Sequence, residues 1–148
     1  MTGKDWQARE ELLGLFRSLG RASLLVDLQD SHSGNMSVKW TDRAGREKIV
    51  ITATGSQKGD LEPSQICFLS PGETDYGHYK ASSETDVHAR ILAIAGVRAS
   101  FHAHTKDLVT ATFDDADKPN TPPAFVPVDP LGWHHLGGEV PVDWLAVP

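Results

Sequence analysis

The sequence predicts one domain over residues 1–148 in which α-helices and β-strands are mixed, and three observations support this fold class. Residues 6–19 space their apolar side chains as an amphipathic helix does. Residues 36–40 and 48–53 alternate in polarity or are rich in β-branched side chains, as paired strands are. Residues 82–95 have the acidic start of a helix and are followed by a glycine. With 39% hydrophobic residues, a chain of this length can bury one core.

The first helix is expected to run from Trp6 to Leu19, with Gly20 at its end. Its apolar residues recur at helical spacing among Arg, Glu and Gln, and they are Leu12, Leu13, Leu15, Phe16 and Leu19. Residues 22–28 form a second helical or extended piece, which leads into a polar turn at residues 30–35.

Strands are expected after this turn, beginning with a hairpin. A polar loop closes the hairpin, a short apolar strand follows, and a stretch rich in Gly, Pro, Asp and Tyr then forms a surface loop. In chain order, the two hairpin strands, the polar loop, the third strand and the surface loop are expected at residues 36–40, 48–53, 54–56, 66–69 and 70–81.

The second helix is expected from Ser82 to about Ala95, with Ser83 as its N-cap and Gly96 as its stop. Its predicted buried stripe consists of Val87, Ile91, Ile94 and Ala95. A strand at residues 98–104 and a short helix at 107–113 should follow. The prolines after Lys118 then leave only short extended pieces and turns, at positions 119, 122, 123, 127, 130, 141 and 148.

Composition excludes several classes of function. The net charge of −6, without any run of Lys and Arg, argues against nucleic-acid binding. The N-terminus lacks the apolar core of a signal peptide, and no apolar run is long enough to span a membrane. The single cysteine, Cys67, lies in an apolar run and is expected to be a buried, inert thiol. We therefore expect a cytoplasmic protein.

Two histidines, His102 and His104, are the first candidates for a functional site. At positions i and i+2 of a strand they point to the same side, where their nitrogens suit zinc or another divalent transition metal. A catalytic zinc normally needs three protein ligands, so the pair alone favours ordinary, partly exposed histidines over a metal site. Glu84, at the predicted helix start, is a candidate acid or base, although acidic residues also favour helix starts for purely structural reasons.

Three loops of small hydrogen-bonding residues accompany these groups: Gly34-Asn35, Thr54-Gly55 and Ser82-Ser83. Individually each loop is a turn, and together they could cradle a phosphate.

The ordered set of motifs resembles the class II aldolase/adducin family. These motifs are Ser33-Gly34-Asn35-Met36-Ser37, Ile51-Thr52-Ala53-Thr54-Gly55, Ala81-Ser82-Ser83-Glu84 and His102-Ala103-His104. The family includes zinc-dependent sugar-phosphate aldolases of the fuculose and rhamnulose type, and the resemblance extends to about Val142. It implies an α/β/α arrangement with a mainly antiparallel central sheet and a homotetramer.

The resemblance also implies roles for individual residues. Glu84 would be the catalytic acid or base, and His102 and His104 would be two zinc ligands. The substrate would be a small phosphorylated sugar, a ketose phosphate or a related hydroxy-carbonyl compound, and its phosphate would be bound by Asn35, Thr54, Gly55, Ser82 and Ser83. An epimerase or dehydratase of the same family would use the same site.

The family's third zinc ligand, in a His-Gly context on a later strand, has no counterpart here, and the chain is shortened at its C-terminus relative to the family pattern. The open alternatives for this ligand are Glu84, His88, His134, His135 or a residue of a neighbouring subunit. His88 is otherwise expected to be a residue of the helix surface or of the core edge. Without a third ligand, the chain would be a catalytically inactive, adducin-like interaction module.

Overall fold

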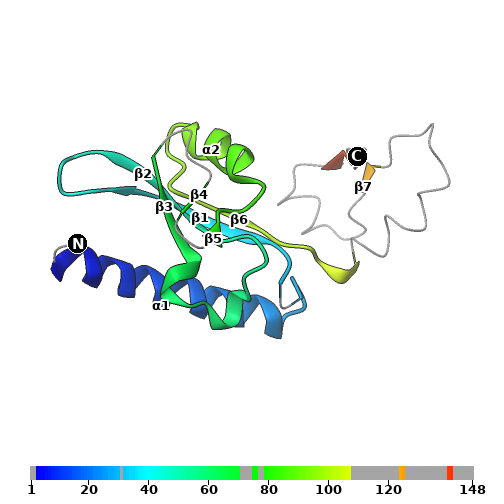
Figure 1. The fold of residues 1–148 in the computed structure, drawn as a ribbon. Coiled ribbons are helices and arrows are strands. Elements are labelled where there is room, and N and C mark those ends of the chain that lie inside the picture. Colours follow the sequence, from blue (N-terminus) through cyan, green and yellow to red (C-terminus); the bar gives the residue numbers. More distant parts are fainter. Residues whose placement is uncertain are drawn as a thin grey trace. The chain divides into compact units, whose positions relative to one another are not determined.

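A four-stranded antiparallel sheet organises the first part of the chain (Figure 1). Its strands are β1 (Asn35–Thr41), β2 (Glu47–Thr52), β3 (Ile66–Leu69) and β6 (Ala99–His102). Their order across the sheet is β3-β2-β1-β6, so the predicted hairpin of β1 and β2 is confirmed and lies at the centre. The strand expected at residues 98–104 is shorter, because it ends at His102.

The computed structural model describes residues 3–30, 32–70, 75–76, 79–107, 124–125 and 140–141. The chain divides into two compact units, residues 1–106 and 107–148. The remaining elements of the first unit are α1 (Gly3–Leu25), η1 (Lys58–Asp60), η2 (Pro63–Gln65), β4 (Asp75–Tyr76), β5 (Tyr79–Lys80) and α2 (Thr85–Ala93). None of the helices that the structure describes is long and apolar enough to cross a membrane.

In the second unit, the strands β7 (Ala124–Phe125) and β8 (Val140–Pro141) pair antiparallel, in keeping with the short extended pieces expected there. The helix expected at residues 107–113 falls outside the described residues except for its first position.

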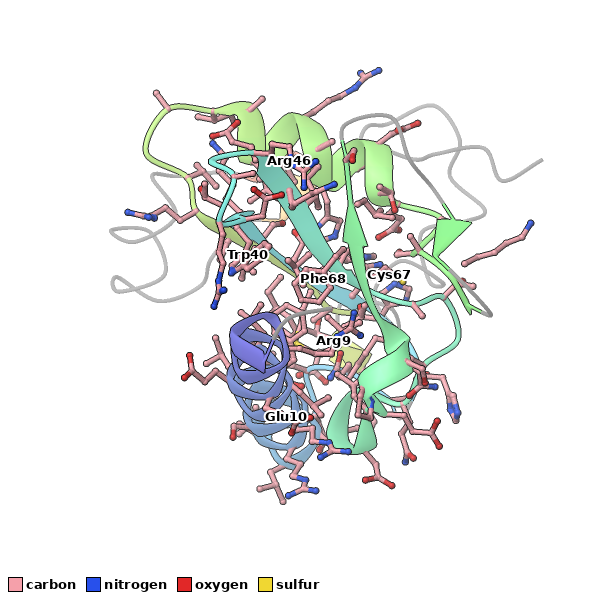
Figure 2. The ribbon with its side chains drawn as sticks, turned by 60° about the vertical axis from the view of Figure 1, so that its left-hand side comes forward. Arg9, Glu10, Trp40, Arg46, Cys67 and Phe68 are labelled. Atoms are coloured by element: carbon pink, nitrogen blue, oxygen red, sulfur yellow. The ribbon has the colours of Figure 1, made fainter. Side chains whose placement is uncertain are left out.

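The two faces of the sheet carry different side chains because strand residues alternate between faces. On one face, Leu13 and Phe16 of α1 pack against sheet residues. Their buried partners are Met36, Val50, Leu61 and Ile66. The α2 helix lies over the opposite face, and the sheet therefore separates the two helices (Figures 1 and 2). This is the predicted layered arrangement with an antiparallel sheet.

Three arginine side chains of α1 hold the connection between β2 and β3 against the helix. Their guanidinium groups donate hydrogen bonds to backbone carbonyl oxygens, from Arg9 to Pro63 (2.6 Å), from Arg17 to Leu61 (2.7 Å) and from Arg21 to Gly59 (2.8 Å). The Arg9 guanidinium also lies 4.7 Å from the centre of the Phe68 ring, a cation–π contact whose two residues are labelled in Figure 2.

The prediction that the first helix ends at Gly20 is wrong, because α1 continues to Leu25. Gly20 serves close packing instead. A Cβ atom at this position would lie 2.2 Å from the carbonyl oxygen of Lys58, so only glycine lets η1 approach the helix this closely. Residues 70–81, expected to be a surface loop, contain the short paired strands β4 and β5.

The buried stripe predicted for the second helix is also wrong. Val87 and Ile94 are 54% and 58% exposed, and the helix ends at Ala93. The buried residues of α2 are Thr85, His88 and Leu92. Hydrophobic periodicity missed this face because the helix turns a polar histidine toward the sheet. Glu84, and not Ser83, occupies the N-cap position.

Cys67 lies on the α2 side of the sheet in a second apolar cluster with Ile51, Ala53, Leu69 and Ala81. The thiol is fully buried, and burial raises its pKa from 9.0 to about 11. The expectation of a buried thiol is therefore confirmed.

We predict that Cys67 resists thiol reagents in the folded protein. The raised pKa leaves about one hundredth of the usual thiolate at pH 8, and the thiolate is the reactive form. Labelling with a chromogenic disulfide should be complete within minutes in denaturant and at least about a hundredfold slower in native buffer. Equal rates in the two conditions would contradict the buried position.

Candidate active site

The register of β1 and β6 brings the first two site residues together. Asn35 pairs directly with His102, and Met36 pairs with Phe101. Because side chains alternate, Met36 joins the core under α1, and Asn35 belongs to the α2 side of the sheet. The pairing therefore places an amide and an imidazole side by side at the beginning of one strand and the end of the other.

Glu84 completes this group from the start of α2. The amide Nδ2 of Asn35 donates a hydrogen bond of 2.7 Å to Oε2 of Glu84, and Nδ1 of His102 bonds to the same oxygen. The side chains of Glu84 and His102 are 38% and 36% exposed, so solvent reaches both. Three of the predicted site residues thus share one hydrogen-bonded cluster.

A turn at Ser82 sets the position of Glu84. The Ser82 hydroxyl accepts a hydrogen bond from the backbone N–H of Glu84 (3.2 Å), and the Ser82 carbonyl accepts one from the Thr85 hydroxyl (2.6 Å). The first of these bonds satisfies a backbone N–H that a helix start leaves without a partner in the helix. Both bonds fix the backbone from which the carboxylate extends.

Glu84 is a carboxylate at neutral pH. Partial burial acts to raise the pKa of this carboxyl, but the hydrogen bond from Asn35 and the electrostatic and hydrogen-bond interactions with His102 outweigh it, so the pKa lies below its usual value. In this ionised state the group is able to accept a proton.

The two histidines of the predicted metal pair are neighbours. Their ring centres are 4.7 Å apart, although His104 lies beyond the end of β6. Because a carboxylate only accepts hydrogen bonds, Nδ1 of His102 carries the proton in its bond to Glu84, which leaves Nε2 as a lone-pair donor. Metal-binding histidines typically have such a carboxylate partner, so this donor set fits a divalent metal with two nitrogen ligands.

The third ligand is not found among the described residues. No group of three His, Cys, Asp or Glu side chains within them could hold a metal ion. His134 and His135, two candidates for this role, lie outside the described residues.

Two of the three predicted phosphate loops, Thr54-Gly55 and Ser82-Ser83, lie side by side. Thr54 donates its backbone N–H to Lys80 (3.0 Å), and Ser82 donates its own to Thr52 (3.1 Å), so the Thr54-Gly55 turn runs beside the Ser82-Ser83 segment. Gly55 has a φ of +66°, a conformation that favours glycine. Thr54, Gly55 and Ser83 are exposed and Ser82 is buried. The contacts of the Asn35 side chain are instead with the Glu84 cluster.

Lys58 links two of these loops from within the protein. Its buried ammonium donates hydrogen bonds to the carbonyl oxygens of Ser56 (2.6 Å) and His32 (3.0 Å), just beside the Thr54-Gly55 and Gly34-Asn35 turns. Burial lowers the pKa of Lys58, and Asp30 acts in the opposite direction. No pattern in the sequence indicates this link, because a lysine in a polar stretch is normally exposed.

His88 is among the candidates for the third metal ligand, but its buried contacts with Asn35 and Ser37 are not predicted from the sequence. It is 1% exposed, so its expected place on the helix surface or at the core edge is wrong. Nε2 bonds to Oδ1 of Asn35, and Nδ1 lies 2.6 Å from the Ser37 hydroxyl. Its position four residues after Glu84, on the same side of the helix, was the available signal.

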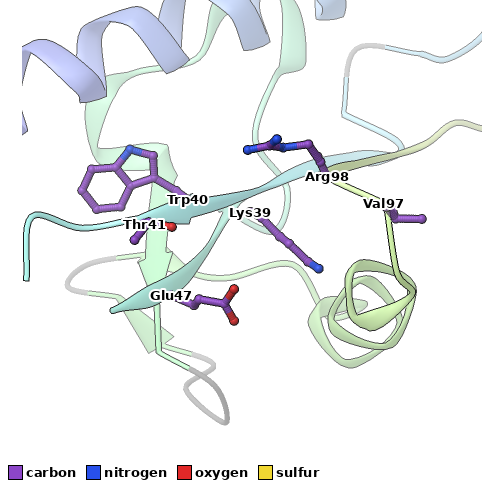
Figure 3. A pocket seen from close by; sticks show the side chains of 7 residues that line it. Lys39, Trp40, Thr41, Glu47, Val97 and Arg98 are labelled. Carbon is purple, nitrogen blue, oxygen red and sulfur yellow. The ribbon is translucent and has the colours of Figure 1, made fainter. Parts of the chain in front are cut away.

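A separate open pocket of about 620 Å³ lies at the other end of β1 (Figure 3). Its lining residues are Lys39, Trp40, Thr41, Glu47, Gly96, Val97 and Arg98, none of which belongs to the predicted site. We place the candidate active site at the Glu84 cluster because that cluster combines a base, an imidazole pair and a buried polar network.

Comparison with known families gives a match that covers most of the chain. The model of the class II aldolase and adducin N-terminal domain matches residues 10–145. The chain belongs to this family. Comparison with curated proteins gave no match.

Solved structures of the family's fold resemble this chain. An L-fuculose-1-phosphate aldolase from Thermus thermophilus superposes with a TM-score of 0.64 and 29% identity, covering 90% of this chain and 63% of that one. A second L-fuculose 1-phosphate aldolase gives a TM-score of 0.54 and 26% identity, covering 65% and 45%. YgbL from Klebsiella pneumoniae, with a TM-score of 0.50, 18% identity and coverages of 69% and 48%, shares the fold. This class II aldolase/adducin chain spans less than two thirds of each of these proteins.

We predict that Gly34→Ala distorts the site, whereas Gly45→Ala does not. Both glycines have positive φ, +68° and +77°, so each substitution strains the backbone by about 1 kcal/mol. At position 34 the new Cβ would also lie 2.3 Å from the His102 carbonyl oxygen, whereas at position 45 nothing lies within 4 Å.

Urea unfolding should show a loss of about 2–4 kcal/mol for Gly34→Ala and about 1 kcal/mol for Gly45→Ala. Equal losses would show that the close contact between Gly34 and β6 carries no extra constraint.

Proposed function

We propose that this chain is a metal-dependent class II aldolase-type lyase that cleaves a small phosphorylated sugar, a ketose phosphate or a related hydroxy-carbonyl compound. The observation that carries the proposal is the cluster in which Glu84 bonds to both Asn35 and His102. The similarity to two L-fuculose 1-phosphate aldolases supports a ketose 1-phosphate as the substrate class.

In this proposal His102 and His104 hold zinc or another divalent metal, because their rings are adjacent and His102 presents Nε2 as a donor. A bound divalent metal supplies Lewis-acid chemistry, drawing electron density from the carbonyl and hydroxyl oxygens of the substrate. Glu84 keeps His102 in the required tautomer.

In the proposed cleavage reaction, Glu84 transfers the proton between the substrate hydroxyl and carbon. Carbon–carbon cleavage by the reverse aldol route removes the proton of a substrate hydroxyl and later adds a proton to carbon. A carboxylate that is ionised at neutral pH and 38% exposed is available to accept this proton and later to return it to carbon. Asn35 fixes the orientation of that carboxylate through its hydrogen bond.

The substrate phosphate is proposed to bind at the adjacent loops. Thr54, Gly55 and Ser83 are exposed there, and Ser82 lies beneath them. Asn35, at the start of β1, is proposed as a further member of this phosphate site by the family resemblance, although its own side-chain contacts are with Glu84 and His88. We further propose that the chain acts in the cytoplasm as one domain over residues 1–148 and as a homo-oligomer, with a tetramer favoured by the family resemblance, without binding nucleic acid or membranes.

One observation favours a second candidate function. Within the described residues no three-ligand metal group exists. A catalytically inactive, adducin-like interaction module would keep the fold without completing the metal site. An epimerase or dehydratase would use the same residues as the aldolase.

Metal binding provides the first test. We expect stoichiometric zinc in the purified protein, and zinc at one hundred times its Kd should raise the free energy of unfolding by about 2.7 kcal/mol. His102→Ala should remove most of this increase while leaving the metal-free protein folded. A wild-type protein that contains no metal and is not stabilised by zinc would favour the inactive module. His134→Ala and His135→Ala, measured in the same way, test for the third ligand.

Glu84→Gln should abolish cleavage while metal binding is retained. The substitution preserves size and removes the base, and proton transfer typically contributes at least about a hundredfold in rate. Release of the aldehyde from ketose 1-phosphates, beginning with L-fuculose 1-phosphate, measures the effect. Asp86→Asn is the matched control, because Asp86 is an exposed acidic residue in the first turn of the same helix and should stay fully active. Unchanged cleavage by Glu84→Gln would refute the assigned role.

A further inference from the structure

His88 is a buried imidazole with a partner on each ring nitrogen. It lies one helical turn after Glu84 on α2 and faces β1. Nδ1 is 2.6 Å from the hydroxyl oxygen of Ser37, and Nε2 bonds to Oδ1 of Asn35. The ring therefore connects two β1 residues that lie on the same side of the sheet.

The direction of each hydrogen bond follows from the chemistry of the partners. The amide oxygen of Asn35 only accepts, so Nε2 of His88 carries the proton. Burial lowers the pKa of His88, although the Glu84 carboxylate acts in the opposite direction, and the ring is neutral at neutral pH. Nδ1 is then an acceptor, and the Ser37 hydroxyl donates to it.

The same chain of bonds fixes the Asn35 amide. With Oδ1 held by His88, the amide can present only its Nδ2 group to Glu84, where it donates at 2.7 Å. Rotating the amide by half a turn would place two acceptors, Oδ1 and the carboxylate, against each other, and two donors, Nδ2 and Nε2 of His88, against each other. His88 thus makes one of the two amide orientations strongly unfavourable.

We propose that His88 is a positioning residue for the reaction: it orients the Asn35 amide, and through it the Glu84 carboxylate. This rests on the proposed role of Glu84 as the base. A residue needed only for packing would be served better by an apolar side chain, since buried polar groups require every partner to be satisfied. Here the buried chain from Ser37 through His88 and Asn35 ends at a carboxylate that solvent reaches.

Two substitutions separate positioning from packing. His88→Leu fills the space without a donor, and the amide of His88→Gln can still donate to Asn35. We expect kcat for cleavage of L-fuculose 1-phosphate to fall about tenfold or more in His88→Leu, with KM within about twofold, and to recover largely in His88→Gln. Val87→Ala, at the exposed neighbouring position, is the control and should match the wild type. Equal kcat losses in the two His88 variants would overturn the proposal.

A second measurement does not depend on activity. Nitrogen-15 NMR of the metal-free wild-type protein should show His88 as the neutral tautomer with the proton on Nε2. The side-chain amide protons of Asn35 should exchange slowly with water in the wild type and in His88→Gln, and faster in His88→Leu.

These readouts remain decisive if the wild type cleaves no sugar phosphate, a result that would overturn the proposed function and not the orientation of Asn35. They also remain decisive if His88→Leu does not fold, because the wild type and His88→Gln suffice. A proton on Nδ1 of His88 in the wild type would overturn the positioning role.

Discussion

The antiparallel pairing of β1 with β6 is the constraint on which the candidate site depends. Asn35 faces His102 because Met36 pairs with Phe101 and both of these apolar residues pack under α1. A shift of one residue in either strand would turn a site residue into the apolar core and an apolar residue toward the site. The hydrophobic core on one face of the sheet therefore fixes the register of the polar residues on the other, and Gly34 permits the close approach that this pairing needs.

The two faces of the sheet are held by different kinds of interaction. Beneath α1, apolar packing is combined with arginine side chains that donate to backbone carbonyls, such as Arg9 to Pro63 and Arg17 to Leu61. Beneath α2, the contact with the sheet includes a buried polar chain through His88. The first arrangement tolerates variation in side chains, whereas the second requires particular donors and acceptors. The candidate site thus lies on the face of the sheet where side-chain geometry is specified most tightly.

Much of this arrangement could be predicted from the sequence. The alternation in residues 36–40 predicts the central hairpin, and the ordered motifs bring Glu84 and His102 into one predicted site. The same motifs assign Asn35 to the phosphate loops, and its hydrogen bond to Glu84 is not predicted. The errors have a common physical cause, since sequence patterns record polarity and not partners. Val87 and Ile94 are expected inside the protein because they are apolar, and His88 outside because it is polar. Gly20 resembles a helix stop because it is a glycine that follows an apolar helical run. Its actual role, the close approach of Lys58, is a tertiary contact that the local sequence does not encode.

The bond from Asn35 to Glu84 has a stereochemical consequence. Asn35 and His102 both contact Oε2, so the two oxygens of this carboxylate are not equivalent. A lone pair of Oε2 that holds a hydrogen bond from the protein is unavailable to a substrate proton. Among the contacts of the described residues Oε2 is the engaged atom, which leaves Oε1 as the oxygen available to a substrate proton in the proposed reaction. Proton exchange would then occur along a single direction, and a site that delivers protons from one direction distinguishes the two faces of a planar carbon.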